Sequence, residues 1–384
     1  MKILVLTKRQ YMGKDLLDDR FGRFRELPLE LAKLGHQVLG ICLSYRPRNQ
    51  AVVKDGSDKA NRFVSWYSVN LGPLILPGLF AYVRQVQSLA RRHQPEILWA
   101  CSDSFHIIAG ASVSRLLNIP CVIDLYDNFE SFKGTRLTGV LPLFKRVVRG
   151  AEGVTCVSWP LADHIIRNYQ RQRPTVVLEN AVRTDLFYAR ERIACRKHFG
   201  FPESATIIGT AGALQKSRGI GVLFRAFEIL SQTEAGLHLA VAGPRDRLTR
   251  IPGRPDVYDM GILPLEEVPT FLNALDVAVI CNKSSLFGRY CFPQKAYEIL
   301  ACRVPFVAAA VGSMNEVLVD YPQCLYEPES AASLAEAIRR QLNAPAVVDA
   351  DVPSWADSAK ELESFLETIL RETSAANLPN PLPA

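Results

Sequence analysis

The chain has 384 residues, of which 48% are hydrophobic and 22% charged, the composition of a globular protein long enough for two domains. It carries a formal net charge of +6, and no apolar run approaches the roughly 18 residues that a membrane-spanning helix needs. Its nine cysteines form no C-x-x-C pair, so we expect reduced thiols in a cytoplasmic protein rather than a disulfide framework or zinc site. The opening segment 1–10 reads as a first strand and not as a signal peptide.

The first part of the chain alternates short apolar strands with helices. Continuous Val, Ile and Leu runs favour a parallel sheet buried on both faces. Pro28 falls inside the first predicted helix, where we expect it to cause a kink. The predicted strands are 3–7, 36–44, 96–102, 120–127, 153–158 and 174–180, and the predicted helices are 21–34, 79–93, 106–116, 141–149 and 160–170.

The same alternation restarts near residue 205. Its predicted strands are 205–213, 237–244, 256–261, 277–282 and 305–311, and its predicted helices are 219–231, 265–274, 293–302 and 331–343. Two such blocks predict an α/β protein with two doubly wound, Rossmann-like domains that face each other across a ligand cleft. We assign residues 1–183 and 184–354 to the two domains. We expect a helix at 355–371 that packs back on the N-terminal domain, and a disordered tail at 372–384.

The segment from Tyr290 to Pro305 is predicted to be a loop, a helix of about three turns and a loop into a strand. Pro293 suits the first helical turn, and Lys295 and Glu298 share one face. Ala296, Ile299 and Leu300 can pack inward. A carboxylate so placed can accept two ribose hydroxyls, and the free amides of the helix start favour a phosphate. An equally acceptable interpretation is a surface helix with a Lys–Glu pair.

The loop 209–219 lies between a strand and a helix and combines glycines with cations. Gly212 and Gly219 let the backbone turn tightly, and Lys216 and Arg218 supply positive charge. The loop matches neither a Walker sequence nor G-x-G-x-x-G, which also disfavours a nicotinamide dehydrogenase. It would suit a diphosphate, and the alternative is a solvated basic loop.

Four polar residues lie at the carboxyl ends of strands in the first block: Asp103, His106, Asp124 and Asp127. Carboxylates and a histidine at this edge can hold sugar hydroxyls or act as a base. The alternative is that each is a helix cap or a turn residue, and Asp103 stands where an N-cap would. His36 follows a glycine that can end a helix, and we interpret it as a structural turn residue.

These motifs, in their order, resemble the retaining, nucleotide-sugar-dependent glycosyltransferases of the GT-B fold, the large family that includes sucrose synthases and mannosyltransferases. The shared landmarks are Gly35-His36-x-Val38, Val157-Ser158, the stretch 179–187 (ENAVRTDLF), the loop from Gly212 to Gly219, Val241-Ala242-Gly243, Pro293-x-Lys295-x-x-Glu298 and the segment 301–305 (ACRVP). The resemblance implies that Glu298 holds the donor ribose and that Arg218, with Lys216, holds the diphosphate. Gly212, Pro293 and Lys295 would also line the donor site.

The chain departs from the family pattern at three places. Tyr290 stands where the family has the first of two glutamates, Asp18-Asp19 replaces a Gly-Gly pair, and Tyr126-Asp127 replaces a His-Asp pair. The first departure leaves open how the donor sugar is contacted, and we count Tyr290 among the donor-site positions. Asp103, His106 and Asp127 remain as candidate catalytic residues.

The resemblance predicts transfer of a sugar from a nucleoside diphosphate sugar to an acceptor hydroxyl with retention, in bacterial polysaccharide, lipopolysaccharide or glycolipid synthesis. We expect no cofactor and no metal, because the one Asp-x-Asp pair, Asp349 and Asp351, follows the last predicted strand. The alternatives are a nucleotide-sugar epimerase of the same fold and a binding protein that has lost its chemistry.

The acceptor could be a carbohydrate, a lipid-linked sugar or a small molecule. Basic residues concentrate in the N-terminal half, but no nucleic-acid motif accompanies them, so nucleic acid is not expected as a partner. The stretch 71–93 is apolar and then basic, as in a peripheral contact with the inner face of a membrane. Alternatively, Leu79, Val83, Val86 and Leu89 form an ordinary core stripe.

Overall fold

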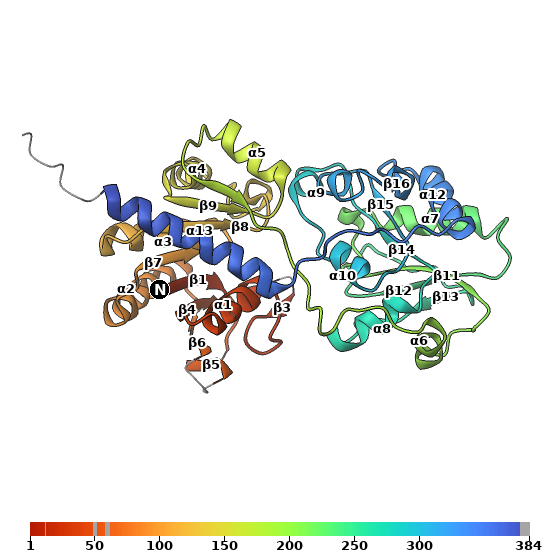
Figure 1. Ribbon diagram of the computed structural model, residues 1–384, viewed down its shortest axis with the longest axis horizontal. Helices are drawn as coiled ribbons and strands as arrows, with labels where there is room; N and C mark the ends of the chain where they lie inside the picture. Colours follow the sequence, from red (N-terminus) through yellow and green to blue (C-terminus); the bar gives the residue numbers. More distant parts are fainter. Residues whose placement is uncertain (12, 49–51, 58–61, 377–384) are drawn as a thin grey trace, which may run out of the picture. The chain divides into compact units, whose positions relative to one another are not determined.

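The computed structural model describes residues 1–376 except 12, 49–51 and 58–61, and the chain forms two compact units (Figure 1). Unit 1 comprises residues 1–179 and the segment from Trp355 onward, and unit 2 comprises residues 180–354. The first boundary therefore falls between Glu179 and Asn180 instead of at 183. Arg23 of unit 1 donates to the Glu179 carbonyl, whereas the Asn180 side chain donates to the Phe292 carbonyl of unit 2.

Unit 1 contains an eight-stranded sheet in the order β10-β9-β8-β7-β1-β4-β6-β5. Every pairing in it is parallel except that of β5 with β6. Its strands are β1 (Lys2–Lys8), β4 (Gln37–Ser44), β5 (Val52–Ser57), β6 (Arg62–Asn70), β7 (Ile97–Ala100), β8 (Cys121–Leu125), β9 (Gly153–Cys156) and β10 (Thr175–Val177), and β2 (Gln10–Tyr11) and β3 (Lys14–Asp15) form a separate pair. The chain order reverses direction between β1 and β7, so these two strands flank the topological switch point of unit 1.

The helices of unit 1 cover both faces of this sheet. They are α1 (Arg23–Lys33), α2 (Ile75–His93), α3 (Ser104–Leu117), α4 (Val140–Gly150), α5 (Trp159–Asn168) and α13 (Trp355–Ala376). The connections through α2, α3 and α4 step along the sheet in the direction opposite to that through α1. Right-handed crossovers therefore place α2, α3 and α4 on the face opposite α1. Helix α1 continues through Pro28 without interruption.

Helix α13 returns to unit 1 and packs against α1. His36 Nε2 lies 2.6 Å from Glu363 Oε1, and the N-terminal amine lies 3.1 Å from His36 Nδ1, so this turn histidine joins the chain's first residue to its last helix. A Cβ at Gly153 would lie 2.9 Å from the Phe365 ring, which shows how closely α13 covers β9. The helix continues to Ala376, beyond the expected end at 371, and the remainder of the predicted tail lies outside the described residues.

Unit 2 contains a parallel six-stranded sheet in the order β13-β12-β11-β14-β15-β16. Its strands are β11 (Thr206–Ala211), β12 (Leu237–Ala242), β13 (Val257–Asp259), β14 (Val277–Ile280), β15 (Phe306–Ala309) and β16 (Leu325–Tyr326). Its helices are α6 (Arg192–Phe199), α7 (Ile220–Leu230), α8 (Val268–Asn273), α9 (Leu286–Tyr290), α10 (Lys295–Ala301), α11 (Met314–Val317) and α12 (Ala331–Asn343). The strand order is that of a dinucleotide-binding Rossmann fold, with the switch point between β11 and β14.

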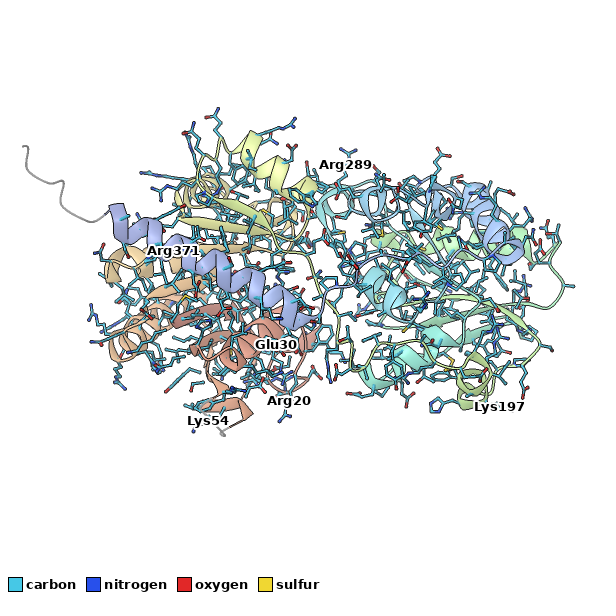
Figure 2. The ribbon with its side chains drawn as sticks, viewed as in Figure 1. Arg20, Glu30, Lys54, Lys197, Arg289 and Arg371 are labelled. Carbon is cyan, nitrogen blue, oxygen red and sulfur yellow. The ribbon has the colours of Figure 1, made fainter. Side chains whose placement is uncertain are left out.

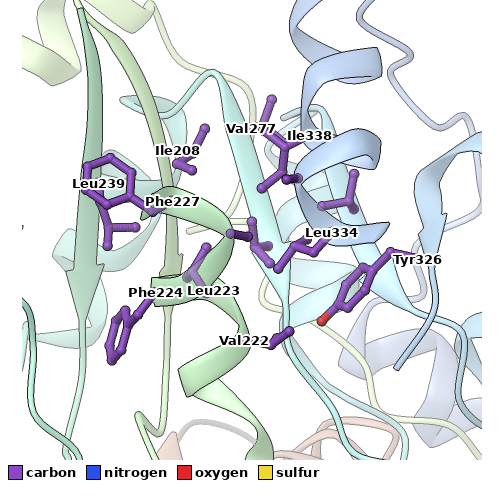
Figure 3. Packing of buried hydrophobic residues seen from close by; sticks show 14 of the residues in the cluster. Ile208, Val222, Leu223, Phe224, Phe227, Leu239, Val277, Tyr326, Leu334 and Ile338 are labelled. Atoms are coloured by element: carbon purple, nitrogen blue, oxygen red, sulfur yellow. The ribbon is translucent and has the colours of Figure 1, made fainter. Parts of the chain in front are cut away.

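The core of unit 2 lies where α7 and α12 pack together on the sheet (Figure 3). Phe227 and Leu223 of α7 meet strand residues such as Leu239 and Val277, and Leu334 comes from α12. All five have no exposed surface, and side chains buried in this way supply most of the free energy of folding. This core holds the carboxyl ends of β11 and β14 side by side. No described helix is long and apolar enough to cross a bilayer.

Candidate functional site

The loop after β11 lies at the switch point of unit 2 and contains the predicted glycine-rich motif. Gly212 and Gly219 have φ of 117° and 86°, which favour glycine, and Lys216–Arg218 form a short 3-10 helix between them. A Cβ at Gly243 would lie 1.9 Å from the Gly212 carbonyl oxygen, so the loop after β12 needs glycine as well. The two loops therefore approach closely at the carboxyl edge of the sheet.

Arg218 is held by the loop that follows β14. Its guanidinium lies 4.4 Å from the centroid of the Phe287 ring in α9, and a Cβ at Gly219 would meet Lys283 Cγ at 3.3 Å. Within the described chain Arg218 forms no ion pair. Its neighbour Lys216 has an exposed side chain, while its backbone amide donates to Asp246 Oδ2 at 3.0 Å. Arg289 of α9 lies at the surface nearby (Figure 2).

Lys295, the first residue of α10, reaches the same glycine-rich loop. A Cβ at Gly212 would lie 3.4 Å from both Cε and Nζ of Lys295. Burial lowers the pKa of this ammonium group, and Arg218 lowers it further, while Cys281 and Glu298 oppose the shift. In the part of the chain that the structure describes, Lys295 forms no ion pair. Two cations thus stand together and neither forms an ion pair, an arrangement that favours an anionic ligand.

Glu298 lies one turn further along α10, on the same side as Lys295. Burial raises the pKa of its carboxyl to about 7, against the lowering effects of Lys295 and of the hydrogen bond from Gln294. That bond, from Gln294 Nε2 to Glu298 Oε1, measures 3.3 Å. A carboxylate with few hydrogen-bond donors around it retains capacity to accept from ligand hydroxyls.

The start of α10 differs from the sequence prediction. The helix begins at Lys295 and has seven residues, so it makes two turns rather than three, and Pro293 precedes its N-cap, Gln294. The Pro293 carbonyl nevertheless accepts from the Ala296 amide at 2.8 Å. Ala296, Ile299 and Leu300 are buried as predicted. Tyr290 is half-buried and ends α9, a helix that the sequence did not predict.

Asp103 lies at the carboxyl end of β7, at the switch point of unit 1. It caps α3 by accepting from the His106 amide at 3.0 Å, and it also bonds His106 Nδ1 at 2.8 Å and the Tyr45 hydroxyl at 2.9 Å. Burial alone would raise the pKa of this carboxyl, but His106 and Lys8 hold it well below its usual range. The His106 ring has no exposed surface. The cap interpretation of Asp103 is therefore confirmed, and His106 reaches any ligand only through Asp103.

Lys8, at the end of β1, is the central cation of this second cluster. Its Nζ donates to the Tyr126 hydroxyl at 3.1 Å. Burial lowers its pKa, against the opposing charges of Asp103 and Asp127. Asp127 is buried and its Oδ1 accepts from the Asn128 amide at 2.7 Å. The structure thus gathers Asp103, Asp127 and Tyr126 around one lysine.

Asp124 belongs to a different part of unit 1. It accepts two hydrogen bonds from Arg23, at 2.8 and 3.1 Å, and one from Thr155 at 2.6 Å. Both charged side chains are wholly buried. This pair joins α1 to β8 and β9 and leaves Asp124 no exposed atom for a ligand. No group of three or more His, Cys, Asp or Glu side chains suited to a metal ion was found among the described residues.

Two family models match the chain, one in each unit. The model described as "Glycosyl transferases group 1" matches residues 205–344, and the one described as "Glycosyltransferase Family 4" matches residues 23–186. Together the two models match most of the chain, and both describe glycosyltransferases. Both the glycine-rich loop and Glu298 fall inside the first match, and Asp103 and Asp127 fall inside the second.

Individual relatives of this chain are distant. It is 27% identical over 247 residues to the putative teichuronic acid biosynthesis glycosyltransferase TuaC of Bacillus subtilis, a match that covers 63% of this chain and 61% of that protein. The matched segment is thus less than two thirds of that relative's own length.

Solved structures match over nearly the whole chain. Sucrose-phosphate synthase from Thermosynechococcus elongatus has a TM-score of 0.72 at 18% identity, with 98% of each chain covered. HepE of Anabaena, in complex with UDP-glucose, has a TM-score of 0.66 at 17% identity, with 98% of this chain and 99% of that chain covered. These likenesses, with the two parallel sheets, confirm the GT-B fold class with its two Rossmann-like units.

Several residues at the two switch points were not predicted from the sequence. Gln294 precedes Glu298 by four residues, a spacing that predicts contact on a helix. Lys8 ends the first strand, where a cation could have been added to the candidate site. Phe287 and Tyr45 left no signal, because their partners Arg218 and Asp103 are distant in the sequence and α9 was not predicted.

Proposed function

We propose that this protein transfers a sugar from a nucleoside diphosphate sugar to an acceptor hydroxyl, with retention of anomeric configuration and without a metal ion. The observation that carries the proposal is the pair Lys295 and Arg218 beside Gly212, two cations that form no ion pair in the described chain and lie at the switch point of a Rossmann sheet. Glu298 stands one turn away with a carboxyl whose pKa is about 7.

In the proposed donor site, the cations bind the diphosphate of the nucleotide and Glu298 binds its ribose. The diphosphate lies against the Gly212 loop, where Lys295 and Arg218 neutralise its charge and the exposed Lys216 can reach it. The ionised Glu298 accepts hydrogen bonds from the two ribose hydroxyls. Tyr290 and Pro293 lie on the link between α9 and α10, and we place them toward the donor sugar. UDP-glucose is the first donor to test, because HepE was solved with it.

Transfer breaks the bond between the anomeric carbon and the diphosphate oxygen, and the electron pair leaves with the diphosphate. Lys295, Arg218 and Lys216 would stabilise the negative charge that develops there, which is the role that a bound metal ion plays in other transferases. For retention, the acceptor oxygen must bond to the face from which the diphosphate leaves, and its proton passes to the departing diphosphate oxygen.

The acceptor is proposed to be a carbohydrate, a lipid-linked sugar or a small molecule that binds unit 1. Asp103, Asp127 and Lys8 offer two acceptors and one donor of hydrogen bonds at its switch point. A role in bacterial polysaccharide or glycolipid synthesis at the inner face of the membrane fits a relative named for teichuronic acid biosynthesis.

A thermal-shift titration tests the donor site. UDP, GDP and their sugars should raise the melting temperature increasingly with concentration, while uridine alone should not, since it lacks the diphosphate. Excess chelator should leave both the shift and the transfer rate unchanged. No shift with any nucleoside diphosphate, or a strict need for manganese, would overturn the proposal. Turnover of a labelled sugar nucleotide without acceptor would instead indicate an epimerase.

A further inference from the structure

The start of α2 exposes a compact group of large apolar side chains, which we call the α2 tip. It consists of Leu74, Ile75, Leu76 and Phe80, exposed by 66%, 63%, 78% and 67%. No other stretch of seven residues in the described chain exposes more than two large apolar side chains. Concentrated exposure of this kind is unusual on a soluble surface and marks a contact with a partner.

The α2 tip is a built part of the fold and not a loose end. A Cβ at Gly78 would lie 1.7 Å from the Leu71 carbonyl oxygen, so the first turn of the helix is packed on the preceding loop. The Leu71 amide in turn donates to the Ser44 carbonyl at 2.9 Å. Tyr82 and Val86 bury the inner face of the same helix. Of the core stripe expected from the sequence, Val86 and Leu89 are buried, whereas Leu79 and Val83 are half-buried.

The outer face of α2 changes from apolar to cationic along its length. Arg84 follows the α2 tip by one turn, and its guanidinium lies 5.8 Å from the centroid of the Phe80 ring. Arg91 and Arg92 occupy the last turn. The sequence between Asp58 and Glu96 contains no acidic residue. A surface with apolar side chains at one end and only cations beyond it complements the interior and the phosphate layer of an anionic bilayer.

A second segment on the same face of the sheet has this character. Helix α3 packs against both α2 and α4. The chain between Glu130 and Glu152 has no acidic residue, and it exposes Leu137 by 65% and Leu143 by 44%. Its exposed cations are Lys133, Arg136, Arg146 and Arg149.

The position of the α2 tip connects this surface with the acceptor side of the protein. In a parallel sheet each helix starts at the carboxyl edge, so α2 after β6 and α3 after β7 both begin there. Asp103 caps α3 at that edge and Lys8 ends β1 beside it. The apolar side chains thus lie at the edge that carries the candidate acceptor residues.

We propose that unit 1 binds the surface of an anionic membrane, with the α2 tip inserted among the lipid head groups and the cations of α2 and α4 against the phosphates. The consequence for the acceptor, which rests on the proposed function, is that it is an amphiphile presented at that surface. A lipid anchor held in the bilayer would bring its hydroxyl to the carboxyl edge of the unit 1 sheet.

The test is flotation of the full chain with vesicles of phosphatidylcholine, with and without phosphatidylglycerol. Binding should require the anionic lipid and weaken with added salt. Leu76→Ser/Phe80→Ser should weaken binding by at least about tenfold, because it removes most of the inserted apolar surface. Arg84→Gln should weaken it by about fivefold. The matched control Leu248→Ser/Ile262→Ser removes side chains exposed by 73% and 65% in unit 2 and should bind as the parent does.

The outcomes separate this inference from the proposed function. Absence of vesicle binding in a protein that still binds UDP overturns the membrane contact alone. Vesicle binding that Leu76→Ser/Phe80→Ser abolishes supports it even if no nucleotide binds. If the parent ignores vesicles and sediments as a dimer that the same variant dissociates, the α2 tip is a contact between copies and the inference is wrong.

Discussion

The two units have switch points of the same topology and opposite electrostatic character. In unit 1 the charges at the switch point satisfy one another: Lys8 lies among Asp103, Asp127 and the Tyr126 hydroxyl. In unit 2 the corresponding edge holds Lys295 and Arg218, neither of which forms an ion pair in the described chain, and beside them Glu298, whose carboxyl has a raised pKa.

This difference indicates how each edge meets its ligand. A cluster that is already paired costs little stability, and it can exchange internal hydrogen bonds for those of a neutral sugar. A cluster of unpaired charges lowers the stability of the fold until an ion of opposite charge binds. Such a cluster therefore indicates a binding site for that ion. This contrast supports the proposal that the nucleotide binds unit 2 and the acceptor binds unit 1.

The largest effect on stability is expected at the buried ion pair of Arg23 and Asp124 in unit 1. Asp124→Asn leaves the guanidinium of Arg23 wholly buried without its counter-charge, and should lower the free energy of unfolding by about 3–5 kcal/mol. Urea denaturation measures this. Asp185→Asn removes half of an exposed pair with Arg183 and should cost less than about 1 kcal/mol. Equal losses would mean that burial does not govern these ion pairs.

The unpaired cations of unit 2 should show the reverse behaviour. Lys295→Gln and Arg218→Gln should each weaken UDP binding by about 10- to 100-fold, because each removes a charged hydrogen bond to the diphosphate. Neither should lower stability, since burial already disfavours the Lys295 ammonium. Isothermal titration calorimetry gives the affinities, with Lys197→Gln of the exposed pair with Glu203 as control. Unchanged affinity in both variants would remove the diphosphate from this loop.

Glu298→Gln should raise the stability of the protein but weaken its binding of UDP. Because burial raises the carboxyl pKa from 4.5 to about 7, the folded state holds this proton more tightly than the unfolded chain. Ionisation at Glu298 therefore costs stability, fully above the folded pKa and not at all below the unfolded one. Near pH 8 the variant should gain about 3 kcal/mol, and the gain should vanish near pH 4.5.

Melting curves across this pH range measure the effect. The same charge should make donor binding by the parent protein weaken as the pH falls through 7, because protonated Glu298 loses an acceptor for the ribose hydroxyls. Glu298→Gln should bind UDP weakly at every pH. A variant that is less stable near pH 8, or that keeps the parent's pH dependence, would contradict the assignment.

The smallest effect is expected at the cap of α3. Asp103→Ala removes the hydrogen bond to the His106 amide and should cost about 1 kcal/mol of stability. UDP affinity should not change, because the residue belongs to unit 1, but the rate of transfer to the acceptor should fall. Asp103→Asn restores the cap without the charge. If it also restores the transfer rate, Asp103 positions α3 and does not contact the acceptor.

The two blocks of alternating strands and helices, and most of the buried strands, could be predicted from the sequence alone, because these patterns depend on residues that are close together along the chain. It also placed Lys295 and Glu298 on one helical face and Ala296, Ile299 and Leu300 inside. It missed the β5–β6 hairpin because residues of β6 alternate between buried and half-buried positions, unlike the continuous apolar runs of the parallel strands.

Which charged side chains pair with one another could be seen only in the tertiary structure. Arg23 meets Asp124 across 101 positions, and Lys8 meets Tyr126 across 118, encounters that follow from strand order and not from local spacing. The pKa of Glu298 and the exposure of the α2 tip likewise depend on how much water the surrounding elements exclude. Local sequence therefore identified Glu298 and Asp103 as candidates. Packing leaves the Glu298 carboxyl with few hydrogen-bond donors and a raised pKa, whereas the Asp103 carboxylate caps α3 and bonds His106.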